Sequence, residues 1–138
     1  MKIITVYSIK GGTGKTTLTV IFINALIKEG YRCLAIDTDA SNNSLSFYFD
    51  DSGELVQDKA IFNVFLGDPI RDCVKTINEN LHLIRGDVRL NEFRSTDSLK
   101  KLKRSLQGLD YDFGIIDTSP TYDNITANVL MASDILKK

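Results

Sequence analysis

A glycine-rich segment near the start of the chain carries residue types that bind phosphate. This segment, Lys10–Thr17, reads KGGTGKTT and follows an apolar run, Ile3–Ile9, that is typical of a buried parallel strand. The next stretch, Leu18–Lys28, is apolar and typical of a helix packed against a sheet and neighbouring helices. Glycines let a backbone approach an anion closely, and the free N–H groups at a helix N-terminus attract phosphate. The order of strand, loop and helix therefore predicts a phosphate cradle.

Two side chains of this cradle are suited to a nucleotide with its magnesium ion. Lys15 is expected to lie along the β- and γ-phosphates, and the Thr16 hydroxyl is expected to ligate Mg²⁺. The residues expected to contact the nucleotide are Gly11, Gly12, Thr13, Gly14, Lys15, Thr16 and Thr17. The loop has Ile9 at the first glycine of the general pattern GxxxxGK[ST], and it has a second lysine, Lys10. A lysine so early in the loop is suited to reaching a partner's phosphates across an interface.

Two further apolar runs end in carboxylates. Tyr31–Asp37 reads as a buried strand with Asp39 just beyond it, and Phe113–Asp117 reads as another. Ligands of open parallel sheets collect at the carboxyl ends of the strands, so these carboxylates are expected to face the phosphates. Asp117 is predicted to hold Mg²⁺ through water. The alternative for Asp39 is that it only begins a turn.

These segments resemble those of one known family. KGGTGKTT resembles the deviant Walker A motif of the ParA/MinD partition and positioning ATPases, and DYDFGIIDTSP resembles their Walker B strand and the turn after it. GYRCLAIDTDASNNS is similar to the family segment that ends in Asp-x-Asp-Pro-Gln, with Ala40 and Ser41 in place of Pro and Gln. The resemblance covers essentially all 138 residues and is strongest at 2–17, 31–45 and 110–134.

The resemblance implies a role for each site residue. Lys10 would be the signature lysine of a dimer that sandwiches ATP, Asp37 would support the Mg²⁺ shell, and Asp39 would orient the attacking water. The catalytic candidates are therefore Lys10, Lys15 and Asp39. The metal candidates are Thr16, Asp37 and Asp117.

The resemblance also implies a fold. We expect a doubly wound α/β domain of the P-loop NTPase type over residues 1–138, the N-terminal part of a ParA-like domain. Four strands are predicted, with Leu81–Ile84 as the third along the chain, and the family strand order is 3-2-4-1-5. Helices are predicted over Lys59–Leu66, from Ser95 or Thr96 to Gly108, and over Thr121–Asp134. Strand 5 would follow Asp134 and is expected to be missing, which would leave Ile3–Ile9 as an open edge.

The implied function is Mg²⁺-dependent hydrolysis of ATP to ADP and phosphate, coupled to homodimerisation across ATP. In this family such proteins act in plasmid or chromosome partition, with a ParB-like centromere-binding adaptor and nonspecific DNA as partners. One alternative is a MinD-like positioning ATPase that cycles on a membrane, and another is a truncated, non-catalytic remnant. We also expect residues 1–138 alone to be marginally stable and nearly inactive.

The composition is that of an ordinary globular chain. Hydrophobic residues make up 43% and charged residues 25% of the sequence, enough for one core and one domain. The longest apolar run, Leu18–Ile27, is too short to span a bilayer, and the start of the chain does not read as a signal peptide. We therefore expect a cytoplasmic protein that does not associate with a membrane.

Three isolated residues receive no catalytic role. Cys33 and Cys73 lack the spacing of a zinc site, which predicts two buried thiols in a reducing compartment. His82 is the only histidine, and we expect it to serve in packing or to lie at the surface. The helix predicted to end at Gly108 carries four basic residues, for which a solvated face is favoured over a DNA contact because the net charge is only −1: Lys100, Lys101, Lys103 and Arg104.

Overall fold

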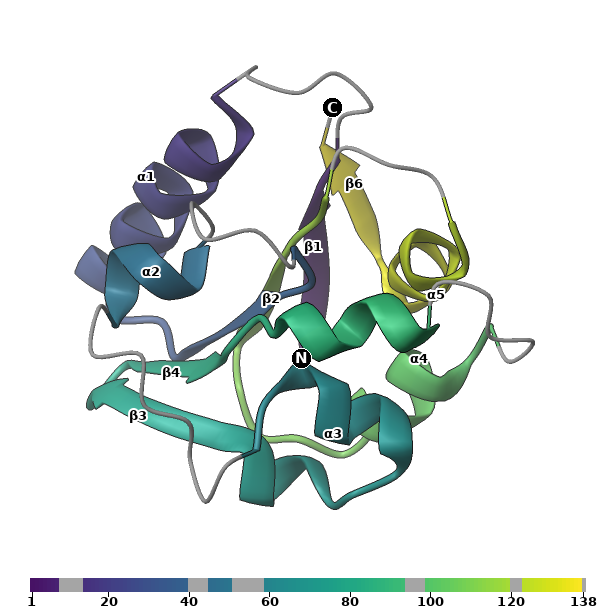
Figure 1. Ribbon diagram of the computed structural model, residues 1–138. Coiled ribbons are helices and arrows are strands. Elements are labelled where there is room, and N and C mark those ends of the chain that lie inside the picture. The colour runs from purple at the N-terminus through teal and green to yellow at the C-terminus, as the bar shows by residue number, and fades with distance from the viewer. Residues whose placement is uncertain (8–13, 40–44, 51–58, 94–98, 120–122, 138) are drawn as a thin grey trace.

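The computed structural model describes residues 1–7, 14–39, 45–50, 59–93, 99–119 and 123–137 (Figure 1). Within these ranges, six strands form one sheet in the spatial order β3-β4-β2-β5-β1-β6. The strands are β1 (Lys2–Val6), β2 (Cys33–Asp37), β3 (Val74–Asn78), β4 (Leu81–Ile84), β5 (Phe113–Asp117) and β6 (Ile135–Lys137). Neighbouring strands run parallel, except that β3 runs antiparallel to β4.

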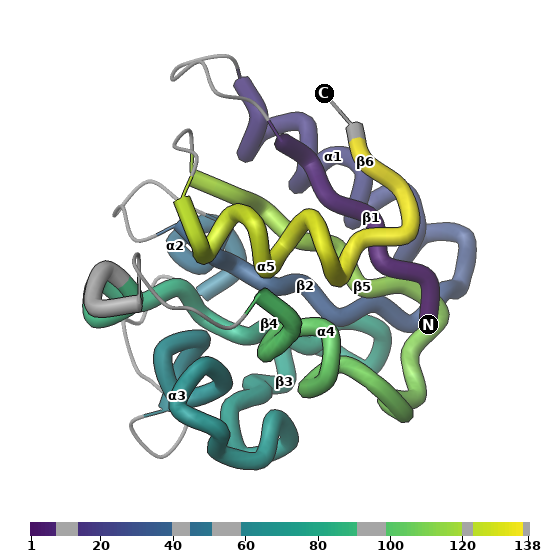
Figure 2. Tube along the Cα trace, turned by 90° about the vertical axis from the view of Figure 1, so that its right-hand side faces the viewer, coloured from purple at the N-terminus to yellow at the C-terminus, as the bar shows by residue number. Residues whose placement is uncertain are grey.

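Helices cover both faces of this sheet. In Figures 1 and 2, α1 and α2 lie on one face, and α3, α4 and α5 lie on the other. The helices are α1 (Lys15–Lys28), α2 (Leu45–Phe49), α3 (Ile61–Leu66), α4 (Lys101–Leu106) and α5 (Asn124–Ala132). Two short 3₁₀ helices, η1 (Ile70–Cys73) and η2 (Val88–Phe93), flank the β3–β4 pair in the chain.

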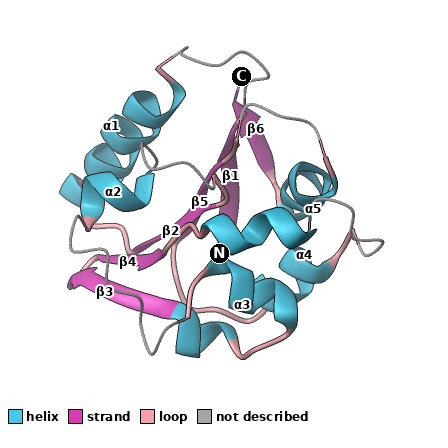
Figure 3. Ribbon diagram, viewed as in Figure 1, coloured by secondary structure: helices cyan, strands magenta, loops and turns pink. Residues whose placement is uncertain are grey.

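The central strands contribute side chains to two separate cores, because successive side chains of a strand point to opposite faces of the sheet. Ile3, Leu34 and Ile36 belong to the core beneath α3, α4 and α5. Ile4 and Ala35 belong to the core beneath α1 and α2. A sheet that is apolar on both sides and covered on both sides is the doubly wound α/β architecture, so the predicted fold class is confirmed (Figure 3).

The expected count of four strands was wrong, and β3 is one of the two strands that were missed. Its sequence, VKTIN, contains three polar residues and shows little of the apolar character of the other strands. It lies at the edge of the sheet, where its side chains are only partly buried or exposed. A two-residue turn joins it to β4, so an antiparallel hairpin accounts for this strand.

The expectation that the first strand is an open edge was also wrong. Ile4–Val6 of β1 pairs with Ile135–Lys137 of β6, which follows α5 directly. Asp134 fixes the start of this pairing: its N–H donates to the Ile3 carbonyl at 2.8 Å, and its carboxylate accepts the Ile3 N–H at 2.8 Å. The order β4-β2-β5-β1-β6 therefore matches the predicted order 3-2-4-1-5, with β6 in the place of the strand expected to be missing.

The four predicted helices are found in place but differ in extent, and α2 was not predicted. The first helix, α1, buries only one side of its surface. Leu18 and Ile21, although large and apolar, are 52% and 60% exposed. The helix predicted over Lys59–Leu66 begins at Ile61 and ends at Leu66, followed by Gly67, whose φ of 100° suits glycine. Two predicted caps, Ser95 and Thr96, lie outside the described residues. None of the described helices combines the length and the apolar character that crossing a membrane requires.

Candidate functional site

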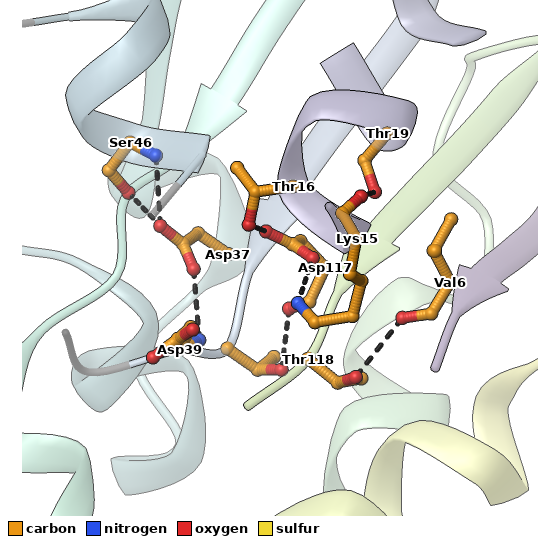
Figure 4. A network of polar contacts seen from close by, with 10 residues as sticks. Val6, Lys15, Thr16, Thr19, Asp37, Asp39, Ser46, Asp117 and Thr118 are labelled. Carbon is orange, nitrogen blue, oxygen red and sulfur yellow. Dashed lines mark hydrogen bonds and ion pairs between the residues drawn. The ribbon is translucent and has the colours of Figure 1, made fainter. Parts of the chain in front are cut away.

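The candidate site lies at the carboxyl ends of β1, β2 and β5. In the sheet register, Asp117 at the end of β5 stands beside Val6 on one side and Asp37 on the other. The first helix begins at this edge with Lys15, after Gly14 in a left-handed conformation (φ 75°) that glycine adopts without strain. The parallel sheet thus brings together residues that are about a hundred positions apart in the chain, as Figure 4 shows.

Asp117 is the centre of the first group of contacts. Its side chain is fully buried and forms an ion pair with the Lys15 ammonium, and its Oδ2 accepts a hydrogen bond from the Thr16 hydroxyl at 2.9 Å. Burial raises the pKa of the Asp117 carboxyl above its usual value, and the lysine and the threonine oppose that shift. All three residues were predicted, and the structure brings them together. Carboxylate and hydroxyl oxygens are the ligands that Mg²⁺ prefers, so Asp117 and Thr16 fit this ion.

Asp37 is the centre of the second group, and its carboxylate faces backbone and hydroxyl donors. Oδ2 accepts hydrogen bonds from the N–H and the hydroxyl of Ser46 at 2.9 and 2.5 Å. Oδ1 accepts the N–H of Asp39 at 2.9 Å. Since both oxygens bind donors from the protein, this carboxylate is placed to hold the segment around it, which suits support of an ion better than direct ligation.

Ser46 was not among the predicted site residues. It is the second residue of α2, nine positions beyond Asp37. Serine is frequent near helix N-termini, but that preference does not say which carboxylate its side chain will contact. The contact depends on how α2 folds back on the end of β2, which periodicity and spacing did not reveal.

Two threonines that the sequence reasoning also missed brace the strand ends. Thr38 donates from both its N–H and its hydroxyl to the Asp117 carbonyl, each at 2.9 Å. The Thr118 hydroxyl donates to the Val6 carbonyl at 3.0 Å. These bonds link β2 to β5 and β5 to β1 where the strands end, so the positions of Asp37 and Asp117 relative to each other are fixed by the sheet and by side chains.

The remaining predicted site residues are in part described by the structure and in part outside the described ranges. Thr17 is exposed, and the neighbouring Thr19 turns its hydroxyl back to the Lys15 carbonyl at 2.8 Å. Asp39 is partly buried, with its N–H bound to Asp37 as described above. Four predicted residues lie outside the described ranges: Lys10, Gly11, Gly12 and Thr13. Their predicted roles stay predictions.

The histidine and the cysteines take no part in the contacts described above for Asp37 and Asp117. His82 Nδ1 shares a hydrogen bond of 2.7 Å with the Tyr111 hydroxyl, and burial together with the nearby Arg32 lowers the pKa of the imidazole. Cys33 and Cys73 are buried free thiols. Burial, assisted by the nearby Asp112, raises the pKa of Cys33 to about 11.

A protein-family model and several known proteins match this chain. The AAA domain family AAA_31 matches residues 1–136. The sporulation initiation inhibitor protein Soj of Bacillus subtilis is 34% identical over 142 residues, which cover 96% of this chain and 55% of Soj. The chain spans about half the length of the curated relatives it matches.

Solved structures share the fold at comparable identity. A plasmid partition protein of Borrelia burgdorferi bound to AMPPNP has a TM-score of 0.85 and 31% identity, over 98% of this chain and 59% of that one. Cobyrinic acid a,c-diamide synthase from Mycobacterium smegmatis with bound ATP analogue and magnesium has a TM-score of 0.86 and 27% identity, over 99% and 58%. From the full-length family match, the Soj relationship and these structures, we conclude that the chain belongs to the ParA/MinD family of deviant Walker A partition and positioning ATPases.

Proposed function

We propose that this chain binds ATP with Mg²⁺ and hydrolyses it to ADP and phosphate, as the N-terminal part of a ParA-like domain that acts in plasmid or chromosome partition. The observation that carries the proposal is the convergence of Lys15, Thr16 and Asp117 at one edge of the sheet. A cation, a hydroxyl and a buried carboxylate at the start of a helix are the groups needed to bind phosphate together with a divalent ion.

The residues would divide the work as follows. Thr16 would hold Mg²⁺ directly and Asp117 through water, and the ion would supply neutralisation of phosphate charge. Lys15 would bind the β- and γ-phosphates, so its ammonium would turn from Asp117 toward the nucleotide. Asp39 would orient the attacking water, and Asp37 would hold the backbone of Asp39 through the hydrogen bond to its N–H.

We further propose that two copies dimerise across ATP, with Lys10 of one copy reaching the phosphates of the other. A ParB-like adaptor and nonspecific DNA are the proposed partners, and the cytoplasm is the proposed location. The support for these points is the relationship to Soj and to a plasmid partition protein, together with the second lysine of the loop.

The experiment that tests the nucleotide site compares Lys15→Ala with Lys28→Ala. Lys28 lies exposed in the last turn of the same helix, so its substitution controls for loss of a charge on α1. Titration with a fluorescent ATP analogue and Mg²⁺ should give tight binding for the unmodified chain and for Lys28→Ala. Lys15→Ala should lose about 2–5 kcal/mol of binding free energy, the usual loss when one partner of a close charge pair is removed. Equal affinity in all three proteins would refute the assignment of Lys15.

A further inference from the structure

The second group of contacts at the site, around Asp37, extends to the end of a strand that the proposed mechanism does not use. The Gly86 N–H, two residues beyond β4, donates to the Ser46 hydroxyl oxygen at 2.6 Å. That hydroxyl in turn donates to Asp37 at 2.5 Å, because a carboxylate can only accept and a backbone N–H can only donate. The direction of the hydrogen bonds is therefore fixed along the whole series, from Gly86 to Ser46 to Asp37.

The series continues to Asp39. One oxygen of the fully buried Asp37 carboxylate binds Ser46, and the other binds the Asp39 N–H. A single carboxylate thus joins the end of β2, the first turn of α2 and, through Ser46, the end of β4. The backbone of Asp39, the residue proposed to orient water, is held by a carboxylate whose own position depends on Ser46.

Gly86 gives a separate reason to regard these segments as one packed unit. A Cβ atom added at Gly86 would lie 2.6 Å from the Asp39 carbonyl oxygen and 2.9 Å from both Cγ and Oδ2 of Asp37. Such distances are too short for any side chain, so the close approach of this loop to both aspartates requires glycine. The end of β4 therefore contacts the Asp37–Asp39 segment by steric fit as well as by hydrogen bonding.

We propose that Ser46 is a positioning residue for the reaction, which fixes Asp39 by tying Asp37 to α2 and to Gly86. This inference rests on the proposed function, because it assigns Ser46 a part in that same site. Ser46 is 4% exposed, and the bonds described above join it to Asp37 and Gly86, whereas Lys15 and Thr16 bind Asp117. Loss of the Ser46 hydroxyl should therefore impair turnover while phosphate binding persists.

The first test is a kinetic comparison of Ser46→Ala with Ser46→Thr and Ser105→Ala. Ser46→Ala should lower kcat about tenfold, the scale of one hydrogen bond to a charged group, with KM and the affinity for a non-hydrolysable ATP analogue changed by less than about twofold. Ser46→Thr keeps the hydroxyl and should recover most of the activity. Ser105→Ala removes a hydroxyl that donates to the Lys101 carbonyl at 2.9 Å within α4, and this variant should behave as the unmodified chain.

The second test substitutes two glycines that have close neighbours, one beside the aspartates of the site and one in the apolar core. Gly86→Ala should lower kcat because its Cβ must displace Asp39 or Asp37. Gly114→Ala places a Cβ 2.7 Å from Cδ1 of Ile3, in the apolar core, so it should affect stability but leave kcat intact. An equal loss of kcat in both glycine variants would contradict the positioning role.

A third measurement decides the matter even if the unmodified chain shows no turnover. Hydrogen exchange of the Asp39 amide can be followed by NMR without nucleotide, since Asp37 accepts that N–H directly. Ser46→Ala should speed exchange at Asp39 about tenfold, again the scale of one such bond, while amides of β2 and β5 exchange as before. Unchanged exchange at Asp39, or a loss of nucleotide affinity as large as the loss of kcat, would overturn the role of Ser46. Failure of the unmodified chain to bind nucleotide would instead refute the proposed function.

Discussion

In the proposed mechanism Lys15 binds two anions in turn, the Asp117 carboxylate and the phosphates of the nucleotide. In the structure its ammonium neutralises Asp117, a fully buried carboxylate whose pKa is raised by burial. A buried carboxylate without a cation is costly, so Lys15 cannot leave Asp117 for a phosphate unless Asp117 gains another positive partner. The proposed binding of ATP is therefore expected to depend on a divalent cation, with the Lys15–Asp117 ion pair as the state without nucleotide.

A residue away from the site gives a prediction about alkaline pH. The pKa of Cys33 is about 11 in the folded chain, against 9.0 for an unperturbed thiol. A group whose pKa is raised by folding contributes stability that is complete below pH 9 and is lost as the pH rises toward 11. At pH 11 the thiol should have withdrawn about 2 kcal/mol of the free energy of unfolding present at pH 8.

Urea unfolding of the unmodified chain and of Cys33→Ala at both pH values measures this effect. The variant should be less stable at pH 8, because it leaves a small cavity in the core beneath α1. It should nevertheless lose less stability between pH 8 and pH 11, since the titrating thiol is gone. Equal losses in the two proteins would show that Cys33 does not couple folding to pH.

At the scale of elements, the short strand β6 pairs with the edge of β1 that would otherwise be open. β6 has three residues, yet it covers the edge of β1, which leads toward the phosphate cradle. Asp134 anchors this pairing through two hydrogen bonds to Ile3, one by its N–H and one by its carboxylate. An uncovered apolar strand edge invites pairing with other chains, so the anchor bears on aggregation as well as on stability.

We therefore expect Asp134→Ala to lower the free energy of unfolding by about 1 kcal/mol, the usual value of one hydrogen bond. It should also increase light scattering on heating, because β6 detaches more readily from β1. Asp110→Ala is the matched control, since the Asp110 carboxylate is fully exposed and its ion pair with Arg32 spans 3.7 Å. If both variants unfold and scatter light alike, the carboxylate of Asp134 does not anchor β6.

The elements that could be predicted from the sequence are those whose pattern of apolar residues matches their burial in the folded chain. β1, β2 and β5 are apolar runs buried on both faces, and their ends coincide with the motifs, so Lys15, Thr16 and Asp117 could be placed together. β3 could not be found, because a polar strand at a sheet edge is held by its hairpin partner. The Ser46–Asp37 contact depends on where α2 packs against the end of β2, and neither periodicity nor spacing encodes that packing.

At the scale of the whole molecule, the sheet separates a polar edge from two apolar cores. Asp37 and Asp117 are buried at the carboxyl ends of the strands, while Cys33 and Tyr111 lie toward the opposite ends. Large apolar side chains on α1 and β6 remain exposed in the described part of the chain: Leu18, Ile21, Ile135 and Leu136. Exposed apolar side chains of this size are candidates for contact with another protein surface.

The last prediction concerns assembly and distinguishes the proposed role of Lys10 from that of Asp39. If two copies sandwich ATP, Lys10→Ala should keep nucleotide binding as a monomer but lose ATP-dependent dimerisation and turnover. Asp39→Ala should instead accumulate an ATP-bound dimer that hydrolyses slowly, because it loses only the residue proposed to orient water. Size-exclusion chromatography with and without Mg-ATP, with Lys28→Ala as the charge control, distinguishes the two behaviours. Dimerisation of Lys10→Ala to the same extent as the unmodified chain would mean that Lys10 does not reach across the interface. The P-loop of each copy would then complete its phosphate site without its partner.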